Sequence, residues 1–425
     1  MAARTTARRV AAFVALASAA SGTGRAVERE PIAAAAPASL SLGVAGAVNE
    51  HASIASDGPR VVVTWGATRS GSPTDVFAAF SRDGGATFDA PVRVNDVPGD
   101  ARVSGEQAPR VALGDGVQVV WATRQAKASV LRRAQMRPQA NAFAPATTAH
   151  ADGLPGARGW ASLVTDSRGA VHVAWLDGRG DGPPPPAASG EARARSSMRQ
   201  DLYQAVWRAD GTHHETRIAT DVCFCCKTAV AAGPDAAVYV AWRHIYKPNL
   251  RDIAVARSTD GGRSFAEPVR VSEDRWAIDG CPDDGPSIAV DARGVVHVVW
   301  PTLVSESAGK GIFYSYSTDG GRTFAPRARV DDGSGRAAHP QIAAGGERLF
   351  VAWDQARPDA PRDVVLRVVA GEPGSRGWSP RMAAPTTLGK GGMYPSVAAT
   401  TAGAIVAWTG ETADGADIIR VQRVP

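Results

Sequence analysis

The residues most suited to chemistry in this sequence are its four cysteines. Cys223, Cys225 and Cys226 fall within four residues, and Cys281 follows 55 residues after the last of them. Cysteine sulfurs in proteins form disulfides, bind soft metal ions such as copper or zinc, or act as redox-active thiol pairs. Because three sulfurs within four residues are poorly suited to simple bridges, the sequence leaves all three hypotheses open.

The elements that must position these cysteines belong to a repeat. Seven short apolar segments end in tryptophan, at residues 61–65, 117–121, 171–175, 238–242, 296–300, 349–353 and 405–408. The tryptophans are 53 to 67 residues apart, and the longest interval contains a Pro/Ala/Ser-rich insertion at 181–197. A period of about fifty residues with four short strands per copy is typical of β-propellers. We therefore expect a single all-β propeller of four-stranded blades, seven-bladed by repeat count, with the tryptophans packed between blades.

Each tryptophan segment is expected to follow the innermost strand of its blade. These first strands should begin near His51, Ala108, Trp160, Lys227, Gly285, His339 and Tyr394. The last copy stops after residues 417–424 and lacks a fourth strand, whereas residues 40–44 precede the first copy and have no sheet of their own. We predict that this N-terminal segment completes the last blade, because pairing removes an exposed sheet edge.

Three turns carry the motif Ser-x-Asp-x-Gly-x-Thr-Phe, with serine replacing threonine in one copy. They occupy residues 81–88, 258–265 and 317–324. Asp83, Asp260 and Asp319 should accept hydrogen bonds from their own turns, a structural role. The motif resembles the Asp box of sialidase-like, or BNR-repeat, propellers. The resemblance implies a propeller, with a six-bladed sialidase-type ring as the alternative, and boxes that lie on the rim away from the active face.

A narrower resemblance covers roughly residues 160–300. The segments at 175–179, 221–228, 251–253 and 276–282 follow one another as in a group of exported bacterial sialidase-like proteins, which share a Cys-x-Cys-Cys and a Gly-Cys-Pro segment. The cysteine spacing carries this similarity, and the resemblance implies no settled activity.

The repeat also predicts where the cysteines meet. The three clustered cysteines precede the first strand expected at Lys227, and Cys281 lies four residues before Gly285. In a propeller the loops that lead into first strands run towards the mouth of the central channel. We therefore expect the four sulfurs to gather at that mouth. The other ligand-face candidates there are residues that differ between blades: His51, His244, Trp276, Asp283, Asp284 and His339.

The sialidase resemblance also implies a set of catalytic residues. Sialidases need three arginines that hold a carboxylate, a tyrosine nucleophile activated by glutamate, and an aspartate acid/base. The candidates here are Tyr394, Arg110, Arg179, Arg243 and Asp177. The Arg-Ile-Pro segment that usually introduces the first arginine is absent from this sequence, and Tyr394 also occupies the generic first-strand position of the repeat.

The N-terminus predicts the compartment. Three arginines, the last at Arg9, precede an apolar run at 10–20, which is typical of a secretory signal peptide. We expect a signal peptide at 1–20, a linker at 21–38 and the propeller at 39–425, hence an exported, periplasmic or secreted protein. No later stretch is apolar for long enough to cross a bilayer.

These patterns favour a binding or assembly module over an enzyme. The formal net charge of +5 is scattered rather than striped, so the sequence gives little support for nucleic-acid binding. We expect a monomer that binds a small molecule, a glycan or a protein at the channel mouth, with copper or zinc as the conceivable cofactor. The alternative from another class is a glycoside hydrolase of exo-sialidase type.

Overall fold

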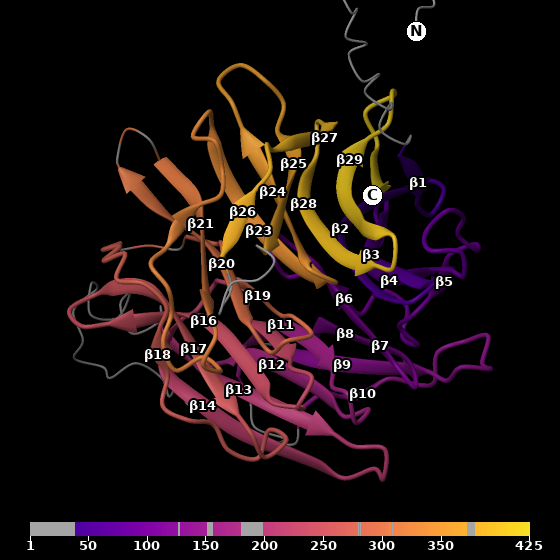
Figure 1. The fold of residues 1–425 in the computed structure, drawn as a ribbon. Coiled ribbons are helices and arrows are strands. Elements are labelled where there is room, and N and C mark those ends of the chain that lie inside the picture. Colours follow the sequence, from indigo (N-terminus) through magenta and orange to yellow (C-terminus); the bar gives the residue numbers. More distant parts are fainter. Residues whose placement is uncertain are drawn as a thin grey trace, which may run out of the picture. The chain divides into compact units, whose positions relative to one another are not determined.

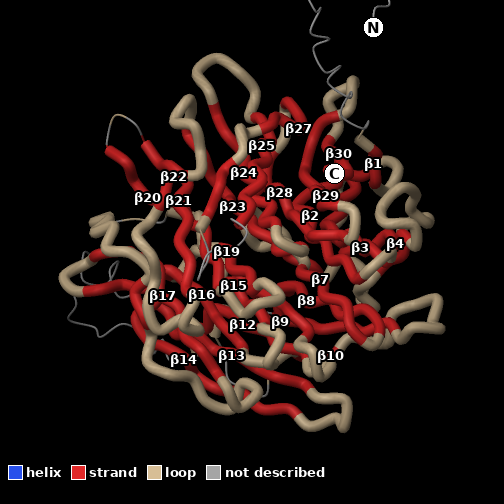
Figure 2. The backbone as a smooth tube through the Cα atoms, viewed as in Figure 1, coloured by secondary structure: helices blue, strands red, loops and turns tan. Residues whose placement is uncertain are grey.

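The computed structural model describes residues 39–425 except 126–127, 151–155, 180–198, 279, 281, 306, 308 and 372–378. The chain divides into two units, residues 1–36 and 37–425, and only the second is described. The expected signal peptide, the expected linker, the insertion and Cys281 lie outside the described residues. In the described part every regular element is a β-strand, which confirms the all-β class (Figure 2). That part also contains no helix able to cross a membrane.

The strands follow one another in antiparallel groups. In chain order the groups are β2 (Ala47–Asp57), β3 (Arg60–Arg69), β4 (Thr74–Ser81) and β5 (Val92–Arg93); β7 (Arg110–Gly114), β8 (Gly116–Gln125), β9 (Ala128–Met136) and β10 (Thr147–Thr148); β11 (Arg158–Thr165), β12 (Val171–Asp177), β13 (Arg199–Trp207) and β14 (His213–Cys223); β15 (Ala229–Ala232), β16 (Val238–Tyr246), β17 (Leu250–Ser258) and β18 (Val269–Arg270); β19 (Ser287–Val290), β20 (Val296–Ser305), β21 (Gly309–Ser317) and β22 (Ala328–Arg329); β23 (Arg336–Gly345), β24 (Arg348–Ala356), β25 (Asp363–Gly371) and β26 (Pro380–Met382); and β28 (Met393–Thr400), β29 (Gly403–Glu411), β30 (Asp417–Val424) and β1 (Leu40–Leu42). Two short strands lie outside these groups: β6 (Ala101–Arg102) pairs with β4 and β8, and β27 (Thr386–Lys390) pairs with β25.

The first strands of the groups lie next to one another around a common centre. β2, β7, β11, β15, β19, β23 and β28 contact each other in this order, and β28 also contacts β2 (Figure 1). The N-terminal strand β1 pairs with β30, with Leu40 opposite Val421, as the sequence predicted. The chain therefore directs the start of every first strand to one central region.

The repeated tryptophans are buried between neighbouring groups. Trp65, Trp121, Trp175, Trp242, Trp300, Trp353 and Trp408 are each at most 2% exposed. Trp65 packs with Ile405 and Ile419 of the last group, and Trp121 packs with Val62 and Val76 of the first. Their burial removes large apolar surfaces from water and confirms the predicted packing role.

The three Asp boxes stabilise their own turns. In the box at 258–265, the Asp260 carboxylate accepts hydrogen bonds from the backbone N–H groups of Arg263 and Ser264 and from the Ser264 hydroxyl, at 2.9, 3.0 and 2.6 Å. Burial opposes ionisation here, but the hydrogen bonds of Ser264 and Ser258 lower the pKa of Asp260 to about 2. Asp83 and Asp319 accept the equivalent bonds.

Candidate functional site

Four of the first strands carry a bulge that turns one side chain out of the regular register. The bulged residues are His51 (φ 59°), Trp160 (φ 51°), His339 (φ 54°) and Tyr394 (φ 53°). A positive φ is unfavourable for residues other than glycine and occurs often where a bulge re-aims a functional side chain. The same position in these first strands thus presents an aromatic or imidazole ring.

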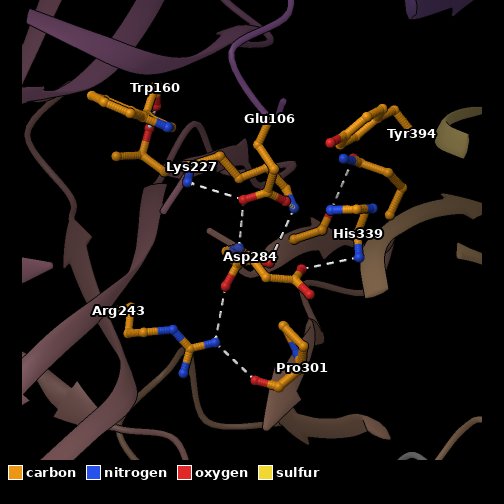
Figure 3. Close-up of polar contacts among 12 residues, drawn as sticks. Glu106, Trp160, Lys227, Arg243, Asp284, Pro301, His339 and Tyr394 are labelled. Carbon is orange, nitrogen blue, oxygen red and sulfur yellow. Dashed lines mark hydrogen bonds and ion pairs between the residues drawn. The ribbon is translucent and has the colours of Figure 1, made fainter. Parts of the chain in front are cut away.

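Three of these rings meet and form what we name the histidine–tyrosine cluster: His51, His339 and Tyr394. The ring centroid of Tyr394 lies 4.8 Å from that of His51 and 4.3 Å from that of His339. The three residues come from β2, β23 and β28, so they meet because β28 contacts both β2 and β23. Figure 3 shows Tyr394 and His339 together, next to Glu106.

Gly105 lies close to both Asp283 and Tyr394. A Cβ atom placed on Gly105 would lie 3.4 Å from Asp283 Oδ2 and 3.9 Å from the Tyr394 hydroxyl oxygen. Asp283 is exposed and also has a positive φ, of 46°. The Asp283 carboxylate and the half-buried Tyr394 phenol therefore both lie close to Gly105.

The surroundings of His339 favour its protonated form. Burial lowers the pKa of His339, but the charge of Asp354 and the hydrogen bond between His339 Nδ1 and Asp354 Oδ2, at 2.6 Å, raise it more, so the net shift is upward. Asp354 is fully buried and also accepts hydrogen bonds from Arg362 and from the backbone N–H of Tyr394. One carboxylate thus fixes both His339 and the start of β28.

His51 has the opposite protonation state. Burial and, to a smaller extent, the nearby positive charges of His339 and Arg110 lower the pKa of His51 to about 4, against a hydrogen bond with the backbone of Gly105 that raises it. Its Nδ1 atom is buried without a hydrogen-bond partner among the described residues. Burial and the charge of Asp283 raise the pKa of Tyr394 to about 12. The cluster therefore combines one imidazole whose pKa is lowered, one imidazole whose pKa is raised, and a phenol whose pKa is raised.

Burial and the carboxylates of Glu106 and Asp284 raise the pKa of Asp283. Groups with strongly perturbed pKa values in one place are typical of functional sites.

A buried ion pair lies beneath this surface. Lys227 Nζ and Glu106 form an ion pair, and both residues are at most 4% exposed. Glu106 also accepts hydrogen bonds from the backbone N–H groups of Gly285 and Lys227, at 2.6 and 3.3 Å, and Lys227 donates to the Gly285 carbonyl at 3.0 Å (Figure 3). Three loops that lead into first strands are thereby joined at one point.

Asp284 contacts the histidine–tyrosine cluster through His339. Its carboxylate pairs with Lys310 Nζ at 2.7 Å and accepts a hydrogen bond from the backbone N–H of His339 at 2.9 Å. Burial raises the pKa of Asp284, but the charges of Lys310 and His339 outweigh it and lower the pKa overall. Asp284 was predicted as a ligand-face residue; it is fully buried and positions His339 instead.

The three arginines suggested for a sialidase mechanism are all bound by protein atoms. Arg110 donates to the carbonyl oxygens of Glu106 and Ala161. Arg243, which is 1% exposed, donates to three carbonyl oxygens, those of Arg251, Asp284 and Pro301 (Figure 3).

Arg179 pairs with Glu215 and with Asp177, the predicted acid/base. Asp177 is itself buried and accepts hydrogen bonds from Arg158 and from the indole of Trp175. These residues hold strands together and leave no arginine triad exposed among the described residues.

Two further ligand-face candidates lie on the neighbouring sheet. His244 Nδ1 accepts a long hydrogen bond from the indole of Trp242, at 3.4 Å, and its ring packs against Tyr246. Trp276 is 7% exposed, and the guanidinium of Arg243 lies 4.9 Å from its ring centroid. Both therefore serve packing around β16 and β17.

The three clustered cysteines form a second candidate site, the cysteine cluster. The Sγ atoms of Cys223, Cys225 and Cys226 lie within 4.8 Å of one another, and all three residues are at most 3% exposed. They pack against Trp160 and Phe224. The cluster was expected at an open channel mouth, but it is buried, because the apolar rings of Trp160 and Phe224 cover it.

The cysteines differ in chemical state. Cys223 and Cys226 carry free thiols, whereas Cys225 does not. Hydrogen bonding from Cys226 and the positive charge of Arg251 lower the pKa of Cys223 against the effect of burial. Burial raises the pKa of Cys226. Of the two thiols, Cys223 therefore has the lower pKa.

A thiol count checks this assignment. We expect two reactive thiols per chain in protein denatured without reductant, and four after reduction, because the sequence contains four cysteines and two of them are free. Peptide mapping of the alkylated protein should place the label on Cys223 and Cys226. A count of zero or four without reductant would contradict it.

No known protein family model matches this sequence, and no curated protein matches it. Among solved structures, a polysaccharide lyase of family PL25, an ulvan lyase bound to -[GlcA(1-4)Rha3S]-, has a TM-score of 0.55 and 11% identity, with 90% of this chain and 95% of that chain covered. A protein of unknown function from Dyadobacter fermentans has a TM-score of 0.50 and 12% identity, with 92% and 99% covered. A Trypanosoma rangeli sialidase mutant with trans-sialidase activity has a TM-score of 0.48 and 13% identity, with 76% and 54% covered. At these identities the first two likenesses concern the fold alone, and the third supports no further argument: the chain has an all-β, propeller-type fold that it shares with the lyase.

Proposed function

We propose that this protein is an exported, seven-bladed carbohydrate-active propeller that binds an acidic polysaccharide at the histidine–tyrosine cluster and cleaves it by β-elimination. The blade number rests on the groups of strands and on the contact of β28 with β2. Export rests on the N-terminal sequence pattern and agrees with a polymeric, extracellular substrate. The lyase with a similar fold is bound to a glucuronic-acid-containing glycan, which supports this substrate class.

The chemistry needs three groups, and the site offers each of them. A cation must bind the uronate carboxylate, a base must remove the proton on the adjacent carbon, and an acid must protonate the oxygen that leaves as the C–O bond breaks and the double bond forms. His339 is the cation. Asp283, which is exposed, and Tyr394, which is half-buried, both lie close to Gly105, so we assign the base to Asp283 and the acid to Tyr394.

One observation carries this proposal: Tyr394 lies between two histidines whose pKa values are shifted in opposite directions. Environments that separate the pKa values of neighbouring groups are typical of acid–base sites. The neutral His51 packs on the phenol ring, and the charged His339 is placed for an anion. The four bulged residues have a positive φ, which is a strained backbone conformation for residues other than glycine, and this strain favours a role beyond folding.

A sialidase mechanism is supported less well. A tyrosine nucleophile needs an activating base, whereas the pKa of Tyr394 is raised to about 12 and the nearby Glu106 is bound to Lys227. The three arginines suggested for carboxylate binding, Arg110, Arg179 and Arg243, are also bound by protein atoms.

The proposal is tested by incubating the protein with polysaccharides that contain uronic acid, ulvan among them. Elimination produces new chain ends together with the ultraviolet absorbance of an unsaturated uronide. Hydrolysis would produce new ends without that absorbance, and release of a fluorophore from a sialoside would indicate a sialidase. Binding in calorimetry without any product would instead support the binding-module hypothesis and contradict the lyase.

The activity should also depend on pH. Because the pKa of His339 is raised above 6.5, its positive charge persists to higher pH than that of a free imidazole and is lost as the pH rises through the shifted value. On the acidic side, activity should fall as Asp283, whose pKa is raised, becomes protonated. We expect a bell-shaped profile of kcat/KM whose alkaline limb disappears in His339→Asn and whose acidic limb disappears in Asp283→Asn. Unchanged limbs in these variants would contradict the roles assigned.

A further inference from the structure

The cysteine cluster is a second candidate site, and it shares no residue with the histidine–tyrosine cluster. The free thiols of Cys223 and Cys226 have their sulfur atoms 3.7 Å apart, and both residues are at most 2% exposed. Trp160 and Phe224 pack against them, so the surroundings are apolar. Two adjacent sulfurs in an apolar setting are a donor set for a soft metal ion.

A buried arginine contacts one of these sulfurs. Arg251 is 2% exposed, and its guanidinium forms no ion pair with a carboxylate among the described residues. Its Nη1 atom donates a hydrogen bond to Cys223 Sγ at 3.0 Å, and its Nε atom has no partner among the described residues. A buried cation needs a compensating negative charge nearby, since its desolvation is otherwise costly. The thiolate of Cys223 supplies that charge.

We propose that Cys223 and Cys226 bind one Cu(I) ion as two thiolate ligands. Two thiolates, one Cu(I) and the guanidinium of Arg251 sum to zero charge, which suits a site closed to water. Cu(I) displaces the remaining thiol proton of Cys226 to solvent and needs no change of oxidation state.

Zinc fits the site less well. A structural Zn²⁺ ion takes four protein ligands in tetrahedral geometry, and a catalytic one takes three. Among the described residues the cluster offers only one further sulfur, that of Cys225, which is disulfide-bonded. The structure therefore favours Cu(I) over Zn²⁺ among the two metals that the sequence suggested.

The test is titration of anaerobically purified protein, without reductant, with Cu(I) in competition with a chromophoric Cu(I) chelator. We expect one Cu(I) per chain, and copper X-ray absorption that shows two sulfur ligands. Cys223→Ser and Cys226→Ser should each weaken binding by about a hundredfold, and Arg251→Met by about tenfold. The matched control is the double variant of His213 and His214, adjacent exposed histidines on β14, which should bind copper as the unaltered protein does.

A readout on the unaltered chain covers the case in which the serine variants do not fold. Bound Cu(I) should protect Cys223 and Cys226 from alkylation, as followed by mass spectrometry, whereas Zn²⁺ at equal concentration should not. Absence of copper binding, equal protection by zinc, or undiminished binding by folded Cys223→Ser would overturn the proposal. These outcomes are independent of any activity on polysaccharides.

Discussion

Tyr394→Phe is expected to reduce turnover of an acidic polysaccharide by about 10³-fold while the fold stays intact. The substitution removes only the hydroxyl that we assign as the general acid, and such groups contribute about 10²- to 10⁴-fold to rate. The phenylalanine ring keeps its contacts with His51 and His339, so thermal stability should change little. The measurement is kcat for product formation, with calorimetric affinity for the substrate as a second readout, which should be nearly unchanged.

The chain offers a matched control for this variant. Tyr246 also has a pKa raised by burial to about 12 and also packs against a histidine, His244, at a centroid distance of 4.6 Å. It lies on β16, outside the histidine–tyrosine cluster, and its buried hydroxyl has no partner among the described residues. Tyr246→Phe should therefore leave kcat unchanged. If both variants lose activity equally, or if Tyr394→Phe keeps it, Tyr394 is not the acid.

The parts of the site that lie on the repeat could be predicted from the sequence. His51, His339 and Tyr394 occupy the position at which first strands begin, and a ring of repeats directs those positions to one centre. Their bulged backbone could not be predicted, because positive φ at histidine or tyrosine leaves no sequence pattern comparable to glycine in a turn.

Residues whose partners are distant in sequence were missed. Glu106 pairs with Lys227, 121 positions away, and Asp354 binds His339 and the start of β28. Neither contact can be predicted from the sequence, because each depends on where loops from different groups of strands converge. For the same reason the sequence could not show that the candidate arginines are engaged by the protein itself. An arginine that donates to carbonyl oxygens of other segments, as Arg243 does, has no sequence pattern that distinguishes it from an arginine that binds a substrate.

The cysteine cluster shows the same division on a smaller scale. That Cys223, Cys225 and Cys226 lie together follows from their spacing. The lowered pKa of Cys223 depends on Cys226 and on Arg251, which reaches Cys223 from β17, beyond the intervening strand β16, and the burial of the site depends on Trp160 from β11. The chemical state of these cysteines therefore could not be predicted without the packing of the surrounding strands, whereas their proximity could.

Glu106→Gln is expected to lower the free energy of unfolding by about 3–5 kcal/mol, the largest stability effect we predict for a single polar substitution. The change leaves the Lys227 ammonium buried without a counter-charge, which is the costly case for a buried ion pair. It also weakens the acceptor for the backbone N–H groups of Gly285 and Lys227, so two loops lose their common anchor. The measurement is equilibrium unfolding in urea at neutral pH.

Two controls separate the charge effect from general damage to the centre. Combining Glu106→Gln with Lys227→Met removes both charges and should recover most of the lost stability, since an apolar replacement of a buried pair is often near neutral. Asp57→Asn breaks the exposed pair with Arg60 and should cost less than about 1 kcal/mol. If Glu106→Gln costs no more than Asp57→Asn, the pair does not hold the loops together. If instead the double variant is as unstable as the single one, the loss comes from the backbone hydrogen bonds of Gly285 and Lys227 and not from the unpaired ammonium.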